Sequence, residues 1–202
     1  FVLAMRGGRM AIFTLILAGI AVSTFFGAGI SLVLSFASHD SIAQFIFWSM
    51  GNLYNVRWES LGLVALPISL GLAALLTFAR DLNVMLLGEE EAQSVGLNVA
   101  RTRIILLVLV SVTTASAVCI SGPIGFVGLI VPHILRLMVG PDNRLLLPAS
   151  ALGGGLFLVG CDLVARLALG VQEINVGIVT ALFGAPYFLF LLVRTGRKEA
   201  SL

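Results

Sequence analysis

Long apolar runs, almost free of charge, constrain this chain more than any other feature. Six of them are near or above the roughly 18 to 20 residues that a helix needs to cross a bilayer. They cover residues 11–36, 60–79, 104–121, 123–139, 145–169 and 176–193. Because backbone N–H and C=O groups find no water partner in lipid, each run is predicted to be helical. The predicted fold class is therefore all-α, a polytopic membrane helix bundle.

The fourth run differs from the others because it is short and holds Pro132, His133 and Arg136. A broken or kinked helix buried among others is predicted here, in place of a lipid-facing span. A haem or metal contact through His133 and Arg136 is the alternative to a structural role. We favour the structural role, because both residues lie beside a proline near the end of the run.

Charge distribution orients the chain in the membrane. Only 11% of the residues are charged, against about a quarter in soluble domains, which excludes an ordinary globular protein. Loops on one side hold most of the basic residues and are predicted to be cytoplasmic by the positive-inside rule: Arg6, Arg9, Arg80, Arg101, Arg103, Arg136, Arg144, Arg194, Arg197 and Lys198. The other side holds Arg57 and Arg166. Scattered in this way, the basic residues give no indication of nucleic acid binding.

The outer loop, residues 39–59, is long enough to contain structure. A short amphipathic helix is predicted from apolar residues at helical spacing, followed by a turn at Gly51 and Asn52. The residues with this spacing are Ile42, Phe45, Ile46 and Ser49. Three aromatic residues suit the membrane interface: Trp48, Tyr54 and Trp58.

The inner loop, residues 80–103, carries the acidic cluster Glu89, Glu90 and Glu91. We predict a short helix with these acids at its positive N-terminal end and Gly96 at its C-terminal end. A second short helix is predicted to follow and to lead into the membrane. The loop is the best candidate for contact with a soluble partner, and an inert solvated loop is the alternative.

Catalytic and metal-binding signatures are absent from the sequence. It contains no phosphate-binding loop, zinc-protease motif or serine-hydrolase motif, and its two histidines, His39 and His133, are far apart. Cys119 and Cys161 lie in apolar runs without CxxC spacing and are predicted to pack in the bundle. We therefore predict no enzyme activity, no metal and no cofactor, so any ATP must bind to another chain.

Several ordered motifs resemble one family. LGEEEAQSVGL at residues 87–97 is similar to the coupling loop of FecCD-type permeases, which belong to ABC importers of iron-siderophores, haem and cobalamin. The remaining similar segments are GPIGFVGL at 122–129, PHILR at 132–136, DNR at 142–144 with LP at 147–148, Asp162 with AR at 165–166, and GIVT at 177–180 with GAP at 184–186. The match covers residues 10–198 almost without interruption.

The resemblance implies an architecture and partners. The family's subunits have ten spans, so these six would be the fifth to the tenth, and residues 1–202 would form a single transmembrane permease domain. The chain starts at Phe1 without a signal-peptide pattern, and we expect it to be the C-terminal portion of a longer protein. The implied partners are a second permease subunit, identical or a close paralogue, two cytoplasmic ATP-binding subunits and an extracytoplasmic binding protein. The implied location is the prokaryotic cytoplasmic (inner) membrane.

The resemblance also implies roles for individual residues. The ATPase-coupling loop would consist of Gly88, Glu89, Glu90, Glu91, Ala92, Gln93, Ser94, Val95, Gly96 and Leu97. Arg166 would dock the binding protein, or pair with Asp162 on its own helix, and both roles stay open. The inner gate would consist of Gly7, Gly8, Met10 and Phe13, in the short loop before the first span. Polar residues would line the pathway: Thr14, Ser23, Thr24 and Ser31.

The functional hypothesis is a non-enzymatic permease that moves its ligand by alternating access, driven by ATP on partner subunits. Ferric siderophore is the preferred ligand because that class is the broadest in the family. An ion-coupled secondary transporter is the alternative, but it should carry ionisable residues near the middle of its spans, and these spans have uncharged centres. An intramembrane enzyme is disfavoured by the missing catalytic residues. The glycines at 153–155 and Gly160 indicate tight helix packing, with a gating hinge as the other possibility.

Overall fold

The computed structural model describes residues 5–6, 9–10, 12–54, 56–167 and 174–199. It confirms the all-α prediction. Apart from strands β1 (Met5–Arg6) and β2 (Arg9–Met10), the elements are α1 (Ile12–Ser35), α2 (His39–Ser49), α3 (Trp58–Thr77), α4 (Ala79–Met85), α5 (Glu89–Ser94), α6 (Val99–Ser121), α7 (Val127–Val139), α8 (Asn143–Leu167) and α9 (Val176–Glu199). The chain divides into two units, residues 1–46 and 47–202, with the boundary inside α2.

The first unit contains one long apolar helix, α1, in which residues Ile16–Ser35 are long and apolar enough to cross a membrane. Before it, β1 pairs with β2 in antiparallel register, with Met5 opposite Met10 and Arg6 opposite Arg9. The short loop predicted ahead of the first span thus contains one pair of short strands. Two-residue strands are too short to show the alternation by which a strand is recognised in a sequence.

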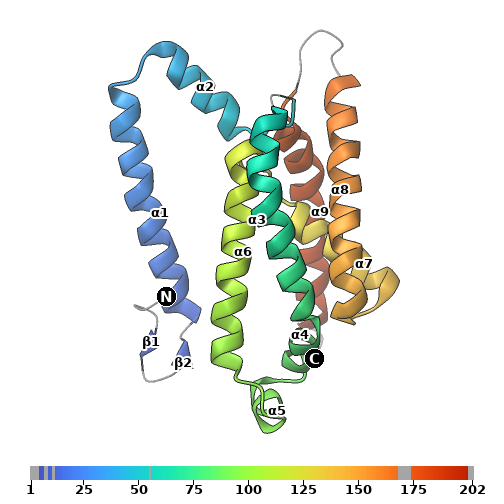
Figure 1. The fold of residues 1–202 in the computed structure, drawn as a ribbon. Coiled ribbons are helices and arrows are strands. Elements are labelled where there is room, and N and C mark those ends of the chain that lie inside the picture. Colours follow the sequence, from blue (N-terminus) through green and yellow to red (C-terminus); the bar gives the residue numbers. More distant parts are fainter. Residues whose placement is uncertain (1–4, 7–8, 11, 55, 168–173, 200–202) are drawn as a thin grey trace. The chain divides into compact units, whose positions relative to one another are not determined.

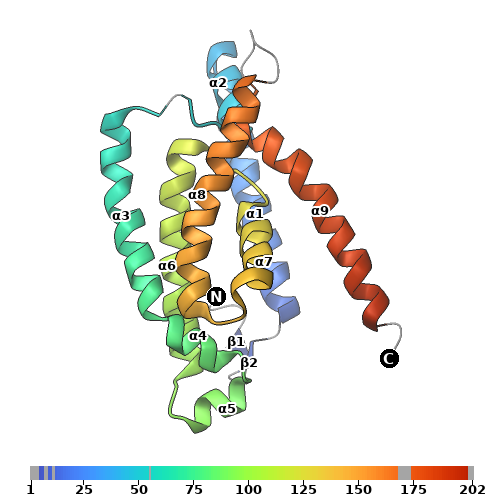
Figure 2. The same cartoon turned by 90° about the vertical axis from the view of Figure 1, so that its right-hand side faces the viewer.

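The second unit is a bundle in which neighbouring long helices run in opposite directions. Helices α3 and α9 run one way, α6 and α8 the other, as Figures 1 and 2 show. Residues Trp58–Thr77, Val99–Ser121 and Asn143–Leu167 are long and apolar enough to span a membrane. Helix α3 packs on α6, where Gly71 faces Thr113 so closely that a Cβ on the glycine would overlap the Thr113 hydroxyl oxygen.

The fourth apolar run forms one short helix, α7, that continues without interruption past Pro132, so the prediction of a broken helix was wrong. The run is shorter as a helix than predicted, because residues 122–126 are not helical and α7 begins only at Val127. Phe126 adopts a left-handed conformation (φ 67°) that is uncommon for a non-glycine residue, and its side chain covers Gly184 of α9. The 13 residues of α7 extend about 20 Å, less than the roughly 30 Å of the hydrocarbon core.

Three glycines join the ends of α2, α6 and α9. Gly51 follows α2 at φ 72°, and its carbonyl accepts a hydrogen bond from the Gly177 N–H at 3.1 Å. The Asn52 N–H donates to the Ser121 carbonyl at 2.8 Å. A Cβ on Gly122 would overlap the Trp48 carbonyl oxygen. The helix predicted in the outer loop is confirmed as α2, and its end is fixed by backbone contacts with distant segments that no local sequence pattern indicates.

Glycines on α8 differ in their surroundings. A Cβ on Gly153 would lie 2.9 Å from Leu135 and 3.2 Å from Val131, both on α7, so close helix packing is confirmed at this position. Gly155 and Gly160 have no described neighbour within 4 Å of an added Cβ. Packing therefore explains only part of the glycine-rich stretch.

Candidate functional site

The short helix α5 is closed at its C-terminus by a complete Schellman motif. The Gly96 N–H donates to the Gln93 carbonyl at 2.9 Å, and the Leu97 N–H donates to the Ala92 carbonyl at 3.1 Å. Gly96 has φ 89°, in the region that favours glycine. Ala92 is fully buried and anchors the helix. The prediction that Gly96 ends this helix is therefore confirmed.

The acidic cluster occupies the first turn of α5. Glu89, Glu90 and Glu91 are all exposed, and their negative charges favour the positive end of the helix. Gly88 precedes them at φ 126°, and a Cβ there would overlap a carboxylate oxygen of Glu91. This local packing leaves a negatively charged turn available to a partner.

The prediction of a second short helix after Gly96 was wrong. Helix α6 begins at Val99 and continues to Ser121, because the Asn98 side chain caps it by accepting from the Arg101 N–H at 3.0 Å. The second short helix is instead α4, which precedes α5. An exposed ion pair between Glu89 and Arg103 also connects α5 to α6.

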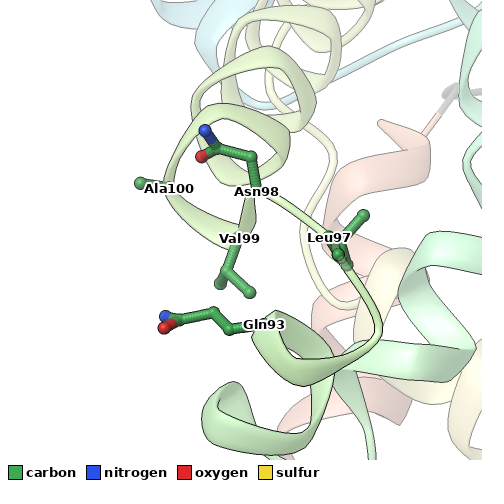
Figure 3. Close-up of a pocket in the computed structure, with 6 residues that line it drawn as sticks. Gln93, Leu97, Asn98, Val99 and Ala100 are labelled. Carbon is green, nitrogen blue, oxygen red and sulfur yellow. The ribbon is translucent and has the colours of Figure 1, made fainter.

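A pocket of about 340 Å³ lies beside the connection from α5 to α6. Figure 3 shows Gln93, Leu97, Asn98, Val99 and Ala100 around it. Val99 is buried, whereas Gln93 and Ala100 are exposed. The pocket adds a concave surface beside the acidic turn of α5. Helix α5 lies beyond the ends of α3 and α6 (Figure 1).

The side chain of Asn83 forms hydrogen bonds from α4 to the N-terminus of α8, against which α4 also packs. Its amide nitrogen donates to Asp142 Oδ1 at 2.5 Å, and its amide oxygen accepts from the Asn143 N–H at 2.8 Å. Asp142 Oδ1 also accepts from the Arg144 N–H at 2.9 Å and so caps α8. Residues 142–144 are recognisable as a motif in the sequence, but no local pattern indicates a role for Asn83.

The charged form of Asp142 is favoured by these contacts. The hydrogen bond from the Arg144 N–H, followed by that from the Asn83 amide, lowers the pKa of the Asp142 carboxyl below its usual value of 3.8. A lowered pKa means that this contribution to stability is fully present above pH 3.8 and is lost as the pH falls through the folded-state pKa. The attachment of α4 to α8 is thus intact at neutral pH.

Arg166 lies in the last turn of α8, at the end away from Asp142. Its Nε is 2.8 Å from Asp162 Oδ2, so the predicted ion pair within the helix is confirmed. The Arg166 side chain is nevertheless 52% exposed. The pairing therefore leaves much of the guanidinium accessible, and docking of a partner stays a prediction.

The predicted gate and pathway residues lie in the first unit. Met10 belongs to β2 and Phe13 to α1, while Gly7 and Gly8 are outside the described residues. The four predicted pathway residues are exposed on α1: Thr14, Ser23, Thr24 and Ser31. Thr24 and Ser31 are seven residues apart and share a face, but Thr14 and Ser23 are about two and a half turns apart and lie on opposite faces. One narrow stripe cannot hold all four.

Of the residues considered for metal binding, His133 and Cys161 pack within the bundle, whereas Cys119 is exposed, so the prediction that it packs there was wrong. The His133 ring makes an edge-to-face contact with Tyr187 of α9, with centroids 6.3 Å apart, which supports the structural interpretation of His133. Cys161 is buried in a cluster with Ala165, Val176 and Val179. No group of three or more metal-ligating side chains occurs among the described residues.

Comparison with known proteins identifies relatives along almost the whole chain. The model of the FecCD transport family matches residues 1–194. The cobalamin import system permease protein BtuC of Halobacterium salinarum is 47% identical over 192 residues, which cover 95% of this chain and 51% of that protein. The hemin transport system permease protein HmuU of Yersinia pestis is 42% identical over 196 residues, covering 96% and 58%.

A solved structure described as a metal-chelate type ABC transporter in an inward-facing conformation matches the fold with a TM-score of 0.83. It is 36% identical and covers 91% of this chain and 61% of that chain. The chain thus spans a little over half the length of the relatives that it matches.

Proposed function

Because the chain belongs to the FecCD transport family, we propose that it forms a membrane-spanning part of the permease subunit of an ATP-driven importer. The observation that carries the proposal is the α4–α5 segment, which ends in an exposed acidic turn beyond the bundle (Figure 1). A projecting, well-capped helix is suited to fit a cleft of a soluble ATPase. The relatives named as import or transport permeases support this role.

In the proposed mechanism, α5 and the residues around it, Gly88 to Leu97, seat in the ATPase. ATP binding closes the two ATPase subunits and moves α5, and the bundle shifts as packed helices between outward- and inward-open arrangements. The permease makes and breaks no covalent bond. Its partners are a second permease subunit, two ATP-binding subunits and an extracytoplasmic binding protein.

The proposed orientation places α5 in the cytoplasm of a prokaryotic cell. Arg101 and Arg103 lie at the α5 end of α6, as the positive-inside rule requires of a cytoplasmic end. Arg166 lies at the other end of α8 and would face the binding protein. The proposed gate at residues 7–13 and the pathway residues of α1 complete this arrangement.

The proposed ligand is a metal chelate. Two relatives are named for cobalamin and hemin, which are both metal-containing macrocycles. These names favour a macrocyclic chelate over the ferric siderophore predicted from the sequence. Specificity would reside chiefly in the binding protein, because the pathway needs only weak contacts to release its ligand.

Uptake by proteoliposomes tests the proposal. Vesicles holding the full-length subunit with its ATPase and binding protein should accumulate radiolabelled cobalamin, haem or ferric siderophore only with internal ATP. Vesicles without the binding protein serve as the control. Uptake that ignores ATP but follows an ion gradient would replace the importer by the ion-coupled secondary transporter.

Charge reversal at Arg166 tests the outer docking surface. Arg166→Glu should weaken binding-protein affinity about five- to tenfold at low salt, because an exposed attractive charge becomes repulsive. The affinity is measured by titrating labelled binding protein onto reconstituted subunit.

Two matched variants separate docking from the ion pair within α8. Asp162→Asn breaks the pair but leaves the Arg166 charge, so the affinity should be retained. Arg57→Glu is the control for charge reversal elsewhere on the proposed outer side. It reverses the charge of Arg57, which is exposed at the start of α3. If Arg166→Glu binds as tightly as the wild type at low salt, only the intrahelical pair with Asp162 remains.

A further inference from the structure

We propose that Asn83 is a positioning residue that transmits movement of α5 to α8, an inference that rests on the proposed function. The two hydrogen bonds of its amide group tie α4 to the first turn of α8. Helix α4 leads directly into α5 in the sequence. Displacement of α5 by the ATPase would therefore be passed through α4 to α8.

The Asn83 amide can both donate and accept a hydrogen bond, and the start of α8 offers one partner for each. It uses its donor on Asp142 and its acceptor on the Asn143 N–H, so both halves of the side chain are satisfied by α8. Asn143 is 7% exposed, so the bond from its N–H is partly shielded from water, while the bond to Asp142 is exposed. A side chain of α4 has thus become part of the N-terminal cap of α8.

The segment between α4 and α5 is itself hydrogen-bonded. The Leu86 N–H donates to the Leu82 carbonyl, the Leu87 N–H to the Val84 carbonyl and the Gly88 N–H to the Met85 carbonyl, at 3.1 to 3.3 Å. Turns therefore continue from α4 to Leu87, and Gly88 at φ 126° then changes the direction of the chain before α5. Packing between α4 and α5 adds to the connection between the two short helices.

A side-chain ion pair also connects α5 to α6. Glu89 and Arg103 link it to α6 through one ion pair, with side chains 61% and 35% exposed. Water and salt screen such a pair. Of the two bonds of Asn83, the one from the Asn143 N–H ends on a buried residue, whereas the one to Asp142 is exposed. The route through α4 and Asn83 therefore adds a path from α5 to α8, besides the chain's own connection from α5 into α6.

Helix α8 is suited to carry the movement across the molecule. It is 25 residues long, about 37 Å, and packs against α7 and α9. Its far end bears Arg166, the proposed docking residue for the binding protein. One helix would thus connect the two proposed docking surfaces, and Asn83 would fasten it to the inner one.

The test measures ligand transported per ATP hydrolysed, in proteoliposomes holding the full-length subunit, its ATPase and its binding protein. Asn83→Ala should lower this ratio about fivefold or more, because the variant complex hydrolyses ATP without moving α8 in step. The double variant Asn83→Asp with Asp142→Asn should restore part of the ratio, since the amide and carboxylate have exchanged places. Thr77→Ala is the control, because its hydroxyl bonds only to the Ala74 carbonyl of its own helix.

The outcomes separate this inference from the function on which it rests. A wild-type ratio in Asn83→Ala overturns the role of Asn83, while ATP-dependent uptake by the wild type still supports the importer. Absence of ATP-dependent uptake in the wild type defeats the importer itself. Should Asn83→Ala fail to assemble, Asn83→Asp is compared with the double variant, and no recovery in the double variant overturns the inference.

Discussion

Replacing Glu89, Glu90 and Glu91 together by lysine in the full-length subunit should weaken ATPase binding by about a hundredfold or more at low salt. Like charges brought together at an interface cost several kcal/mol, and three exposed carboxylates change sign here. The lysines would also oppose the positive end of α5. Co-purification of the ATPase, its affinity and ligand-stimulated ATP hydrolysis measure the effect.

A neutral triple variant separates loss of docking from damage to α5. Replacing the three glutamates by glutamine keeps a hydrogen-bond acceptor for Arg103 but removes the charges. Its affinity should be intermediate, and the difference between the two variants should shrink as salt is raised. Glu59→Lys, at the start of α3 and on the proposed outer side, should leave ATPase binding unchanged. Unchanged coupling in the lysine variant would show that α5 is not the ATPase contact.

Elements that depend on local rules were predictable from the sequence. Apolar runs located the long helices, since their length and lack of charge leave few alternatives in lipid. Gly96 was recognisable as a helix end because a left-handed residue in that position is usually glycine. The ion pair of Arg166 with Asp162 followed from their spacing of four residues.

Features that depend on contacts between distant segments were not predictable. Asn83 and Asp142 are 59 residues apart, and nothing local to α4 shows that an asparagine there caps another helix. The late start of α7 at Val127 reflects the non-helical residues 122–126, one of which, Gly122, lies against the end of α2. Only the packed structure shows which glycines are required by a neighbour and which are not.

Gly177→Ala should destabilise the protein by about 1 to 3 kcal/mol, the usual cost of an added methyl group in a well-packed site. Its Cβ would overlap the Met50 carbonyl oxygen. That carbonyl belongs to the backbone and cannot rotate away, because the neighbouring Gly51 accepts a hydrogen bond from the Gly177 N–H. Thermal unfolding of the purified full-length subunit in detergent measures the effect.

The expected loss of stability in Gly177→Ala is opposite in sign to the usual effect of replacing glycine by alanine in a helix. Gly177 lies within the first turn of α9, and in a helix interior replacing glycine by alanine would ordinarily stabilise the helix by about 0.5 to 1 kcal/mol. Gly160→Ala on α8 is the matched control, since no described atom lies within 4 Å of its added Cβ, and it should unfold at the same or a higher temperature. If Gly177→Ala is as stable as Gly160→Ala, the ends of α2 and α9 are not held together by the close backbone contact at Gly51.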